Sequence, residues 1–555
     1  MYVTPIRLLS SEIVNLIAAG EVIDSLAAVV RELVENAIDA EATRLTISIL
    51  PELWQVEVAD NGRGISLENL RHCAKAHHTS KICDLDDLWK ITSLGFRGEA
   101  LFSITQVGQL TIKSRDATDY QTGWCVDYNQ QGEVIKEATS PMAPGTIVTA
   151  SDLFGTIPVR RQGLPTFKQQ LKAIQGIIDN MSLCHPQITW QVYHHHKPWL
   201  TISPGKTPQQ ILPQLVKSVH FHDLQFLCET MVTPCQEEAK LEMVLGLPDR
   251  TSRGRLDWLK IAVNGRVVRS PQLEQTVLAA LSRTLPKGRF PIGFLHFKIP
   301  PSEIDWNRHP AKTEIYLQSL DFWQDQVTEI IEKVLKLSPL TITTVGQNQR
   351  VKKLLKASEN KGVYHVGSSD SNELDLIKLR AVGQVNKTYI VAEHSQGLWL
   401  VEQHIAHERV LYEKLQDEWQ LITVQQAIIL TELSSKQVEQ LERIGIDIEP
   451  FGDNTWAVRT VPKLLETRAD CAEGLMELSL GGDLESAQVA VACRSAIRNG
   501  MVLELSQMQD LLDSWKKTRN PRTCPHGRPI YLSLEESSLS RFFRRHWVIG
   551  KSHGI

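Results

Sequence analysis

A carboxylate and an amide lie four residues apart in the amino-terminal part of the chain, at Glu32 and Asn36. On a helix, side chains at this spacing project from the same face. An aspartate follows at Asp60, directly before a turn that contains Gly62 and Gly64. Glycines let the main chain approach a ligand closely and leave backbone N–H groups available to it. Together these groups predict a nucleotide site, with ATP as the leading hypothesis.

Hydrolysis of ATP requires a base or water-positioning group near the γ-phosphate, an oxygen ligand for Mg²⁺, and a group that selects adenine. Glu32, Asn36 and Asp60 can supply one each. The glycine-punctuated residues 95–101 predict a lid that ends at a helix start, where free N–H groups favour phosphate oxygens. Each pattern alone would also fit a tight hairpin or a solvated helix face. Their combination in this order favours the nucleotide site.

The bulk composition limits the possible classes of protein. A chain of 555 residues is too long for one core, so we expect several domains. The net charge of -4 neither favours nor excludes nucleic acid, so a DNA contact must come from local basic clusters. Nine cysteines without a framework spacing predict reduced thiols. No apolar run reaches the roughly 18 residues that span a bilayer, and we expect a cytoplasmic protein with no membrane contact.

Capping residues and apolar periodicity predict the elements that would position these groups. Ser10 and Ser25 predict the starts of two helices, the second of which carries Glu32 and Asn36. Alternating apolar and polar residues predict strands, one of which leads to Asp60. Helices that cover one sheet would form an α+β domain. The predicted elements are strands at 45–50, 54–58, 110–114 and 146–150, a helix at 167–181, a β-rich segment from about residue 241 that closes with a helix through Leu335, a hairpin at 388–392 and 398–401, and a helix through Leu415.

Four strings resemble a known family: RELVENAIDA, DNGRGI, HHTSKI and GFRGEAL. They are similar to the GHKL ATPase family and, within it, to the MutL proteins of DNA mismatch repair. The resemblance extends over essentially the whole chain apart from a linker. It implies ATP and Mg²⁺ as cofactors, with Glu32 as the catalytic base, Asn36 as the Mg²⁺ ligand and Asp60 as the residue that reads adenine. It further implies nucleotide contacts from Gly62, Gly64, Thr79, Ser80, Lys81, Gly95, Phe96, Arg97, Gly98 and Thr146.

A later string, EIDWNRHPAKTEI, resembles the family pattern VDVNVHPAKHEV. The resemblance implies that Lys312 of the second domain contacts the γ-phosphate, with Asn307 nearby; a compact ammonium suits phosphate oxygens. Two strings depart from the family. His78 replaces the alanine of HATSK, and LFGTIPVRRQGL replaces LFYNTPARRKF, so the packing of the lid and between domains can differ. Neither change affects Glu32, Asn36 or Asp60.

The fold class expected from the residues and the resemblance is α+β multidomain. The resemblance implies a GHKL-type ATPase α/β sandwich, a ribosomal-protein-like α/β second domain, a flexible linker and an α/β C-terminal dimerisation domain. Apolar periodicity fades after residue 338, where Gly, Ser, Asn and Lys dominate, which is typical of a linker. The expected bounds are 1–215, 216–337, 338–374 and 375–555, with an inserted regulatory subdomain at about 425–487.

Three distant strings in the last third carry side chains that can bind metal. His404 and Glu408 are four residues apart and would face one ligand from a helix, and Cys524 and His526 can reach it from a loop. Imidazole, thiolate and carboxylate together suit Zn²⁺ or Mn²⁺, and the sequence leaves open which. A His/Glu pair alone is more often surface decoration. The string CPHGRP makes the metal hypothesis much stronger.

These strings resemble the endonuclease site of MutL proteins that nick DNA, with patterns DQHAxxExxxxE, ACR and CPHGRP and a terminal FxR, here at residues 542–544. The resemblance adds Glu402 and Cys493 to the metal ligands. Glu402 replaces the aspartate of the family, and Ile405 replaces its alanine. The longer Glu402 side chain would shift the carboxylate by about one methylene, which matters for catalytic geometry. We therefore expect metal binding more strongly than nicking.

The expected partners follow from local basic groups and from the resemblance. Arg266 lies in a string that matches the DNA-contacting VNGR of the family, and Arg269 follows it. We expect contacts to the backbone of double-stranded DNA without sequence preference, because no base-reading helix is evident. The resemblance also implies a homodimer and a MutS-type mismatch sensor. Residues 426–429 faintly resemble a peptide that binds a sliding clamp, without its usual proline.

Three functions remain open from the sequence. The first is an ATP-gated mismatch repair endonuclease that dimerises through its last domain and closes its ATPase domains around DNA. The second is an ATP-switched matchmaker without nuclease activity, in which the metal site is structural or regulatory. The third is a different GHKL protein, namely a chaperone, a gyrase-type subunit or a histidine kinase. The third is disfavoured because no phosphoacceptor histidine box precedes the ATP strings.

Overall fold

The computed structural model describes residues 10–81, 93–95, 98–118, 122–305, 316–337, 377–395, 397–452, 454–480, 482–536 and 539. The chain forms two compact units. The first comprises residues 1–244, 258–275 and 293–325, and the second comprises 245–257, 276–292 and 326–555. Both units combine helices with sheets, so the α+β multidomain prediction is confirmed.

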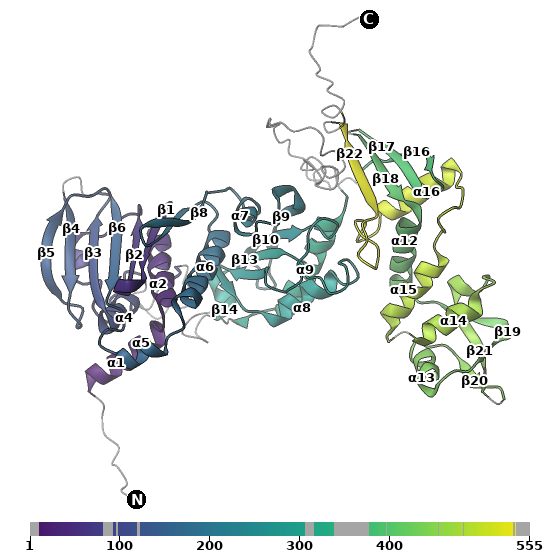
Figure 1. Ribbon diagram of the computed structural model, residues 1–555, viewed down its shortest axis with the longest axis horizontal. Helices are drawn as coiled ribbons and strands as arrows, with labels where there is room; N and C mark the ends of the chain where they lie inside the picture. Colours follow the sequence, from purple (N-terminus) through teal and green to yellow (C-terminus); the bar gives the residue numbers. More distant parts are fainter. Residues whose placement is uncertain are drawn as a thin grey trace, which may run out of the picture. The chain divides into compact units, whose positions relative to one another are not determined.

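An eight-stranded sheet dominates the amino-terminal part of the first unit, with strand order β5-β4-β3-β6-β2-β1-β7-β8 (Figure 1). Strand β1 pairs antiparallel with β2 and parallel with β7. Apolar side chains alternate along β1, and Leu45, Ile47 and Ile49 are fully buried. The strands are β1 (Arg44–Leu50), β2 (Gln55–Asp60), β3 (Gln109–Arg115), β4 (Gly123–Tyr128), β5 (Val134–Ser140), β6 (Gly145–Ser151), β7 (Thr189–His194) and β8 (Lys197–Ile202).

Helices accompany this sheet, and α2 packs against both β2 and helix α6. The predicted caps are found, because Ser10 and Ser25 occupy the N-cap positions of the first two helices. Helix α6 covers and extends the stretch predicted at 167–181. The helices of this part are α1 (Ser11–Val22), α2 (Leu26–Asp39), α3 (Leu67–Leu70), α4 (Ala100–Val107), α5 (Pro158–Gly163), α6 (Phe167–Cys184) and α7 (Pro208–Leu215).

A second sheet follows, with strand order β12-β11-β13-β10-β9. It begins at Leu224, earlier than the predicted start near residue 241. The reason is that β9 lies at the sheet edge and is only partly buried, so its sequence lacks a clean alternation. The elements are β9 (Leu224–Val232), β10 (Glu238–Gly246), β11 (Leu259–Val263), β12 (Arg266–Val268), α8 (Pro271–Ala280), β13 (Gly293–Lys298), β14 (Ile304–Asp305), β15 (Tyr316–Leu317) and α9 (Leu320–Leu335).

The carboxy-terminal part of the second unit contains two further sheets with separate cores. The predicted hairpin is found as β17 and β18 in the four-stranded sheet β16-β17-β18-β22. A three-stranded sheet, β19-β21-β20, has its own buried core. The elements are β16 (Arg380–Val385), β17 (Tyr389–His394), β18 (Gly397–Glu402), α12 (Gln403–Asp417), β19 (Leu421–Thr431), α13 (Ser435–Arg443), β20 (Ile448–Pro450), β21 (Thr455–Pro462), α14 (Cys471–Leu480), α15 (Leu484–Ser495), α16 (Leu505–Lys516) and β22 (Tyr531–Glu535).

Within the described ranges, no single helix combines the length and the apolar composition needed to cross a bilayer. Only the bent pair formed by 13–22 and 26–39 reaches that threshold together, across a bend of 81°. The expected linker, residues 338–374, lies outside the described residues.

Candidate nucleotide site and metal cluster

Helix α2 carries the two residues with which the nucleotide prediction began. The Ser25 hydroxyl accepts a hydrogen bond from the Ala28 N–H at 3.2 Å and so fixes the first turn. One face of the helix is buried, while Glu32 and Asn36 share a partly exposed stripe. The Glu32 Oε1 atom accepts from Arg31 Nε and Nη2, both at 3.2 Å. The structure therefore places the proposed base and Mg²⁺ ligand one turn apart on the same side of α2.

Strand β2 ends at Asp60, and the turn that follows wraps around this carboxylate. The Gly62 N–H donates to Asp60 Oδ1 at 2.8 Å, and the Thr146 backbone N–H of the paired strand β6 also donates to it. Gly64 has a φ of 74°, and a Cβ there would lie 1.9 Å from the Arg115 carbonyl oxygen, so only glycine fits. Asp60, Gly62 and Thr146 thus form one group, as predicted for an adenine contact.

Binding of ATP is expected to weaken below about pH 6 because of Asp60. Burial raises the pKa of Asp60 to about 6, although hydrogen bonds from Gly62 and Thr146 oppose the shift. The carboxyl is therefore mostly ionised at neutral pH, where it could accept the proposed bond from the adenine amino group, but it is largely protonated near pH 5. Since only about a tenth of the carboxylate remains there, we expect the Kd for ATP to rise about 10-fold between about pH 7.5 and pH 5.

The measurement is a fluorescence titration with an ATP analogue across this pH range. An Asp60→Asn variant lacks the titrating group, so it separates the contribution of Asp60 from protonation of the nucleotide itself. An equal pH response in both proteins would contradict the assignment.

Asp39, one turn after Glu35 on α2, joins several segments beside Asn36. Its carboxylate accepts from Leu94 N at 2.8 Å and from Gly95 N at 3.0 Å, and it pairs with Lys81 Nζ at 2.5 Å. The same ammonium lies 3.3 Å from Asn36 Oδ1. A Cβ on Gly95 would lie 3.2 Å from both Asn36 Oδ1 and Lys81 Nζ, so the backbone of Gly95 rests against the amide. The predicted residues Asn36, Lys81 and Gly95 are thus neighbours.

The other predicted nucleotide contacts have different outcomes. The Thr79 hydroxyl accepts from Lys81 N at 3.2 Å, and Ser80 is exposed between them. Gly98 has a φ of 64° and lies against the backbone of His78 and the side chain of Thr79. The remaining predicted contacts lie outside the described residues, namely Phe96, Arg97, Asn307 and Lys312.

Arg266 and Arg269, predicted to contact DNA, occupy different environments. Arg269 is exposed. Arg266 is buried, and its guanidinium donates to Glu35 Oε2 at 2.5 Å and to the Leu94 carbonyl oxygen at 2.8 Å. A guanidinium that is enclosed in this way does not face a DNA backbone. DNA contact by Arg266 therefore stays a prediction, and in this conformation the guanidinium contacts Glu35 and the Leu94 carbonyl instead.

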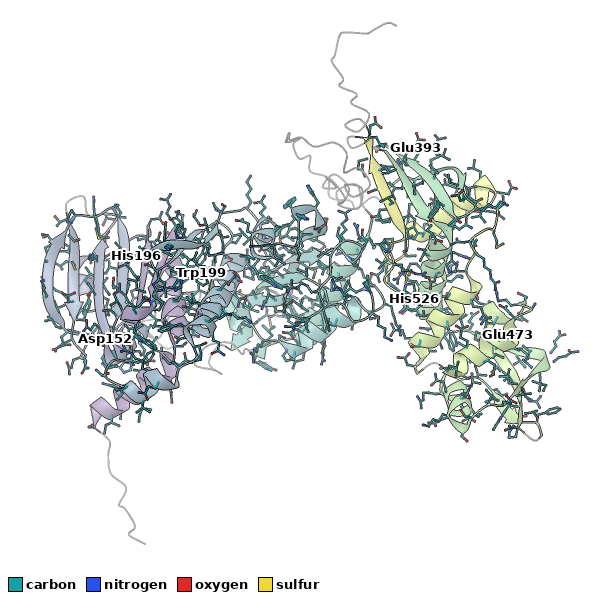
Figure 2. The ribbon with its side chains drawn as sticks, viewed as in Figure 1. Asp152, His196, Trp199, Glu393, Glu473 and His526 are labelled. Atoms are coloured by element: carbon teal, nitrogen blue, oxygen red, sulfur yellow. The ribbon has the colours of Figure 1, made fainter. Side chains whose placement is uncertain are left out.

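Three of the predicted metal ligands meet in the second unit. Side-chain atoms of Glu408, Cys524 and His526 lie within 4.8 Å of one another. Glu408 projects from α12 and is fully buried, with Oε1 at 2.8 Å from His526 Nδ1, and Figure 2 shows His526 beside α12 and α15. Oxygen, sulfur and nitrogen ligands of this kind fit Zn²⁺ or Mn²⁺.

The groups of this cluster shift one another's pKa values. Hydrogen bonds to Cys524 and Glu408 raise the pKa of His526 to about 9. Burial would raise the pKa of the Cys524 thiol, but hydrogen bonds from His526 and Arg528 hold it below its ordinary value. Burial likewise opposes the lowered pKa of Glu408, which is due to His526 and Arg528. His526 and Arg528 both lie beside the Glu408 carboxylate, at 2.8 and 3.4 Å, and a divalent cation at this position would displace the proton of His526.

The structure uses the remaining predicted ligands in different ways. Cys493 is hydrogen-bonded to Glu408, and burial raises the pKa of its thiol to about 11. His404 Nδ1 lies 3.0 Å from the Ile497 carbonyl oxygen, which leaves Nε2 available to a ligand. Glu402, in contrast, caps α12: its Oε2 accepts from Ile405 N at 2.6 Å, and its Oε1 accepts from Asn499 at 2.5 Å. Glu402 is thus engaged outside the Glu408 cluster.

Known proteins share the sequence of this chain over nearly its whole length. Family models match residues 24–150 (histidine kinase-, DNA gyrase B-, and HSP90-like ATPase), 219–336 (DNA mismatch repair protein, C-terminal domain) and 382–503 (MutL C terminal dimerisation domain). The chain is 90% identical over 551 residues to the DNA mismatch repair protein MutL of Crocosphaera subtropica, which covers 99% of this chain and 100% of that protein. The chain belongs to the MutL family of DNA mismatch repair proteins. The MutL proteins of Rippkaea orientalis, 65% identical with 100% of both chains covered, and of Microcystis aeruginosa, 60% identical with 99% of this chain and 100% of that one covered, are also similar.

Within this MutL chain, sequence reasoning missed residues that hold the nucleotide site together. Asp39 and Glu35 lie inside the quoted string RELVENAIDA, yet neither was assigned a role. Their spacing carried a signal, because residues 32, 35, 36 and 39 of one helix form a single stripe.

In the C-terminal part, sequence reasoning also gave no role to His407, which lies on α12 next to Glu408. Its Nδ1 accepts from Ile497 N at 2.9 Å, and burial lowers its pKa to about 4.

Proposed function

We propose that this chain is an ATP-switched mismatch repair protein that acts as a homodimer on double-stranded DNA. The observation that carries the proposal is the joint placement of Glu32, Asn36 and Asp60 in a MutL ATPase domain. Glu32 would take a proton from the attacking water, and Asp60 would accept the adenine amino group. Mg²⁺, held by Asn36, would neutralise charge on the phosphates.

Lys81 is the side chain that binding of Mg-ATP would affect most. Its ammonium lies beside Asn36 Oδ1, the atom proposed to bind Mg²⁺. Mg²⁺ at that oxygen would repel the ammonium, so Lys81 would turn from Asn36 toward the phosphates when Mg-ATP enters. Lys312 and Asn307 are proposed to reach the γ-phosphate from the second domain. The residues on α2 would thereby sense the triphosphate.

Calorimetry with Mg²⁺ and a nonhydrolysable ATP analogue tests the nucleotide proposal. We expect saturable heat with one site per chain, and an Asp60→Ala variant should bind far more weakly. Wild-type protein that produced no binding heat would overturn the proposal, whatever its C-terminal domain does.

The surface proposed for homodimerisation lies at the edge of the four-stranded sheet. Strand β16 is an edge strand, and its Gln384 exchanges hydrogen bonds with the backbone of Met501 and Leu503. Exposed apolar side chains gather on β16 and on residues 501–505, and a second copy of the chain could cover them. They are Val382 (54% exposed), Val385 (46%), Met501 (51%), Val502 (65%) and Leu505 (55%).

Replacement of Val502 by aspartate is expected to raise the dimer dissociation constant by about 30-fold, because a charge replaces a central apolar contact worth about 2 kcal/mol. Analytical ultracentrifugation across a dilution series measures the change. Leu480→Asp is the matched control, since Leu480 is 75% exposed in helix α14, outside the proposed surface. Equal dissociation constants for all three proteins would exclude this surface.

The proposed partners are DNA, a MutS-type mismatch sensor and a sliding clamp. Arg269 is exposed and remains a candidate for backbone contacts. Gln426, Ala427 and Ile429 are exposed on β19, where the pairing with β21 is interrupted between Thr423 and Ile428. An interrupted, exposed strand segment is accessible to a partner, which supports the clamp proposal.

Metal-dependent nicking of DNA is the finer proposal for the C-terminal domain. The cluster of Glu408, Cys524 and His526 supports it, with Cys493 and His404 as further ligands. A bound Zn²⁺ or Mn²⁺ would supply an activated water and stabilise the leaving oxygen. The alternative, a matchmaker without nuclease activity, is favoured by the engagement of Glu402 as a helix cap. A nicking assay, described in the Discussion, separates the two.

A further inference from the structure

The hairpin turn between β11 and β12 is held rigidly and presents Arg266 to the ATPase domain. Asn264 and Gly265 both have left-handed backbone, with φ of 45° and 85°. The Asn264 side chain bonds both the N–H and the carbonyl of Ile299, at 2.9 and 2.8 Å. The Gly265 N–H donates to His296 Nε2 at 2.9 Å. These bonds leave the next residue, Arg266, little freedom of position.

The guanidinium of Arg266 contacts two separate segments of the ATPase domain. Nη2 lies 2.5 Å from Glu35 Oε2 on helix α2 and 2.8 Å from the Leu94 carbonyl oxygen. The side chains of Arg266 and Glu35 are only 8% and 3% exposed. A buried charge is strongly disfavoured without its partner, so neither group leaves this position alone. The planar fork of arginine can serve both acceptors, which a lysine ammonium on a longer flexible stem does poorly.

Asp39 holds the same peptide from the other side. Its carboxylate accepts the N–H groups of Leu94 and Gly95, while Arg266 holds the Leu94 carbonyl. Gly95 is thereby fixed against Asn36 Oδ1, where a Cβ would have only 3.2 Å. Glu35 and Asp39 lie on the stripe of α2 that also carries Glu32 and Asn36. One arginine of the second sheet thus fixes both the helix and the backbone that border the nucleotide site.

We infer that Arg266 is a positioning residue for ATP hydrolysis, acting through Glu35 and the Leu94 carbonyl to set Glu32 and Asn36 relative to the bound phosphates. The inference rests on the proposed ATPase function. The inference gives Arg266 a role other than DNA contact. It also implies that a shift of the turn at 264–265 would be transmitted through Arg266 to helix α2.

The test compares four variants of the full chain with the wild type. Arg266→Lys keeps the buried charge, Arg266→Gln removes it, and the double variant Glu35→Gln/Arg266→Gln removes both charges together so that no buried charge is left unpaired. Arg255→Gln is the control, because Arg255 is an exposed arginine that belongs to neither proposed site. Steady-state ATPase rates without DNA, ATP Kd by fluorescence, thermal melting and DNA binding are measured for each.

We expect kcat to fall about 10-fold in Arg266→Lys and in the double variant, while the Kd for ATP stays within about twofold. DNA affinity should remain that of the wild type in these variants, and Arg255→Gln should match the wild type in every measurement. A lower melting temperature with unchanged kcat per folded molecule would overturn the inference in favour of a purely structural pair. Loss of DNA affinity with an intact DNA-free ATPase rate would overturn it in favour of DNA contact. Failure of the wild type itself to hydrolyse ATP would instead refute the proposed function.

Discussion

Replacement of Glu32 by alanine is expected to reduce kcat for ATP hydrolysis by about 10²- to 10⁴-fold while ATP still binds. The magnitude is that of a general base, which acts only in the transition state. Glu32 projects from α2 on the stripe that carries Asn36, and its present contact is the neighbouring Arg31. Because Glu32 is proposed to act on the attacking water and not on the adenine or the phosphates, the Kd for ATP should change by less than about threefold. Phosphate release measures kcat, and fluorescence titration measures the Kd for ATP.

Glu52→Ala is a suitable control for the loss of a carboxylate. The Glu52 side chain is 66% exposed and pairs with His195, away from α2. Its turnover should equal that of the wild type. If Glu32→Ala hydrolysed ATP at the wild-type rate, the base would have to be another residue. If it lost ATP binding as well, Glu32 would be acting on the bound state and not on the transition state.

The local part of this site could be predicted from the sequence because its signals are local. Ser25 caps α2, the period of the helix sets Glu32 beside Asn36, and β2 ends at Asp60 as its alternation indicates. A glycine turn then follows from residue type alone. These are properties of segments of a few residues, and a single segment determines each of them.

The contacts between segments could not be predicted in this way. Arg266 meets Glu35 across 231 positions of sequence, and Asp39 meets Leu94 and Gly95 across more than 50. Neither pairing has a periodicity or spacing that a sequence displays, since each depends on how two sheets pack. The string that contains Arg266 was noticed for its resemblance, and the burial that decides its role becomes visible only in the fold.

For the cluster of Glu408, Cys524 and His526, the sequence likewise indicated features of single segments but not the contacts between them. The string CPHGRP drew attention to Cys524 and His526, and the structure brings Glu408 to them. The spacing of His404 and Glu408 predicted one helix face, but it could not indicate that Glu402 would cap that helix. Helix capping competes with metal binding for a carboxylate at this position, because an N-cap acceptor satisfies free N–H groups of the first turn.

Replacement of His526 by alanine is expected to lower Mn²⁺-dependent nicking of supercoiled plasmid by at least about 100-fold, if the wild type nicks. His526 is the best choice of the three proposed ligands because its side chain is 45% exposed, whereas Glu408 and Cys524 are fully buried. The variant removes the proposed nitrogen ligand, so bound metal per chain, measured by mass spectrometry of metals, should fall together with nicking.

Glu473→Gln is the matched control, since Glu473 is exposed on helix α14 and is separate from the cluster in Figure 2. It should keep both metal and nicking. A wild type that binds metal but does not nick DNA would support the matchmaker function without nuclease activity. The Glu402→Asp variant then tests whether the longer side chain at this position is the cause. The shorter side chain restores the carboxylate length of the nicking relatives, so a gain of nicking in Glu402→Asp would assign the missing activity to one methylene at the cap of α12. Nicking that survived in His526→Ala with no bound metal would remove the cluster from the reaction altogether.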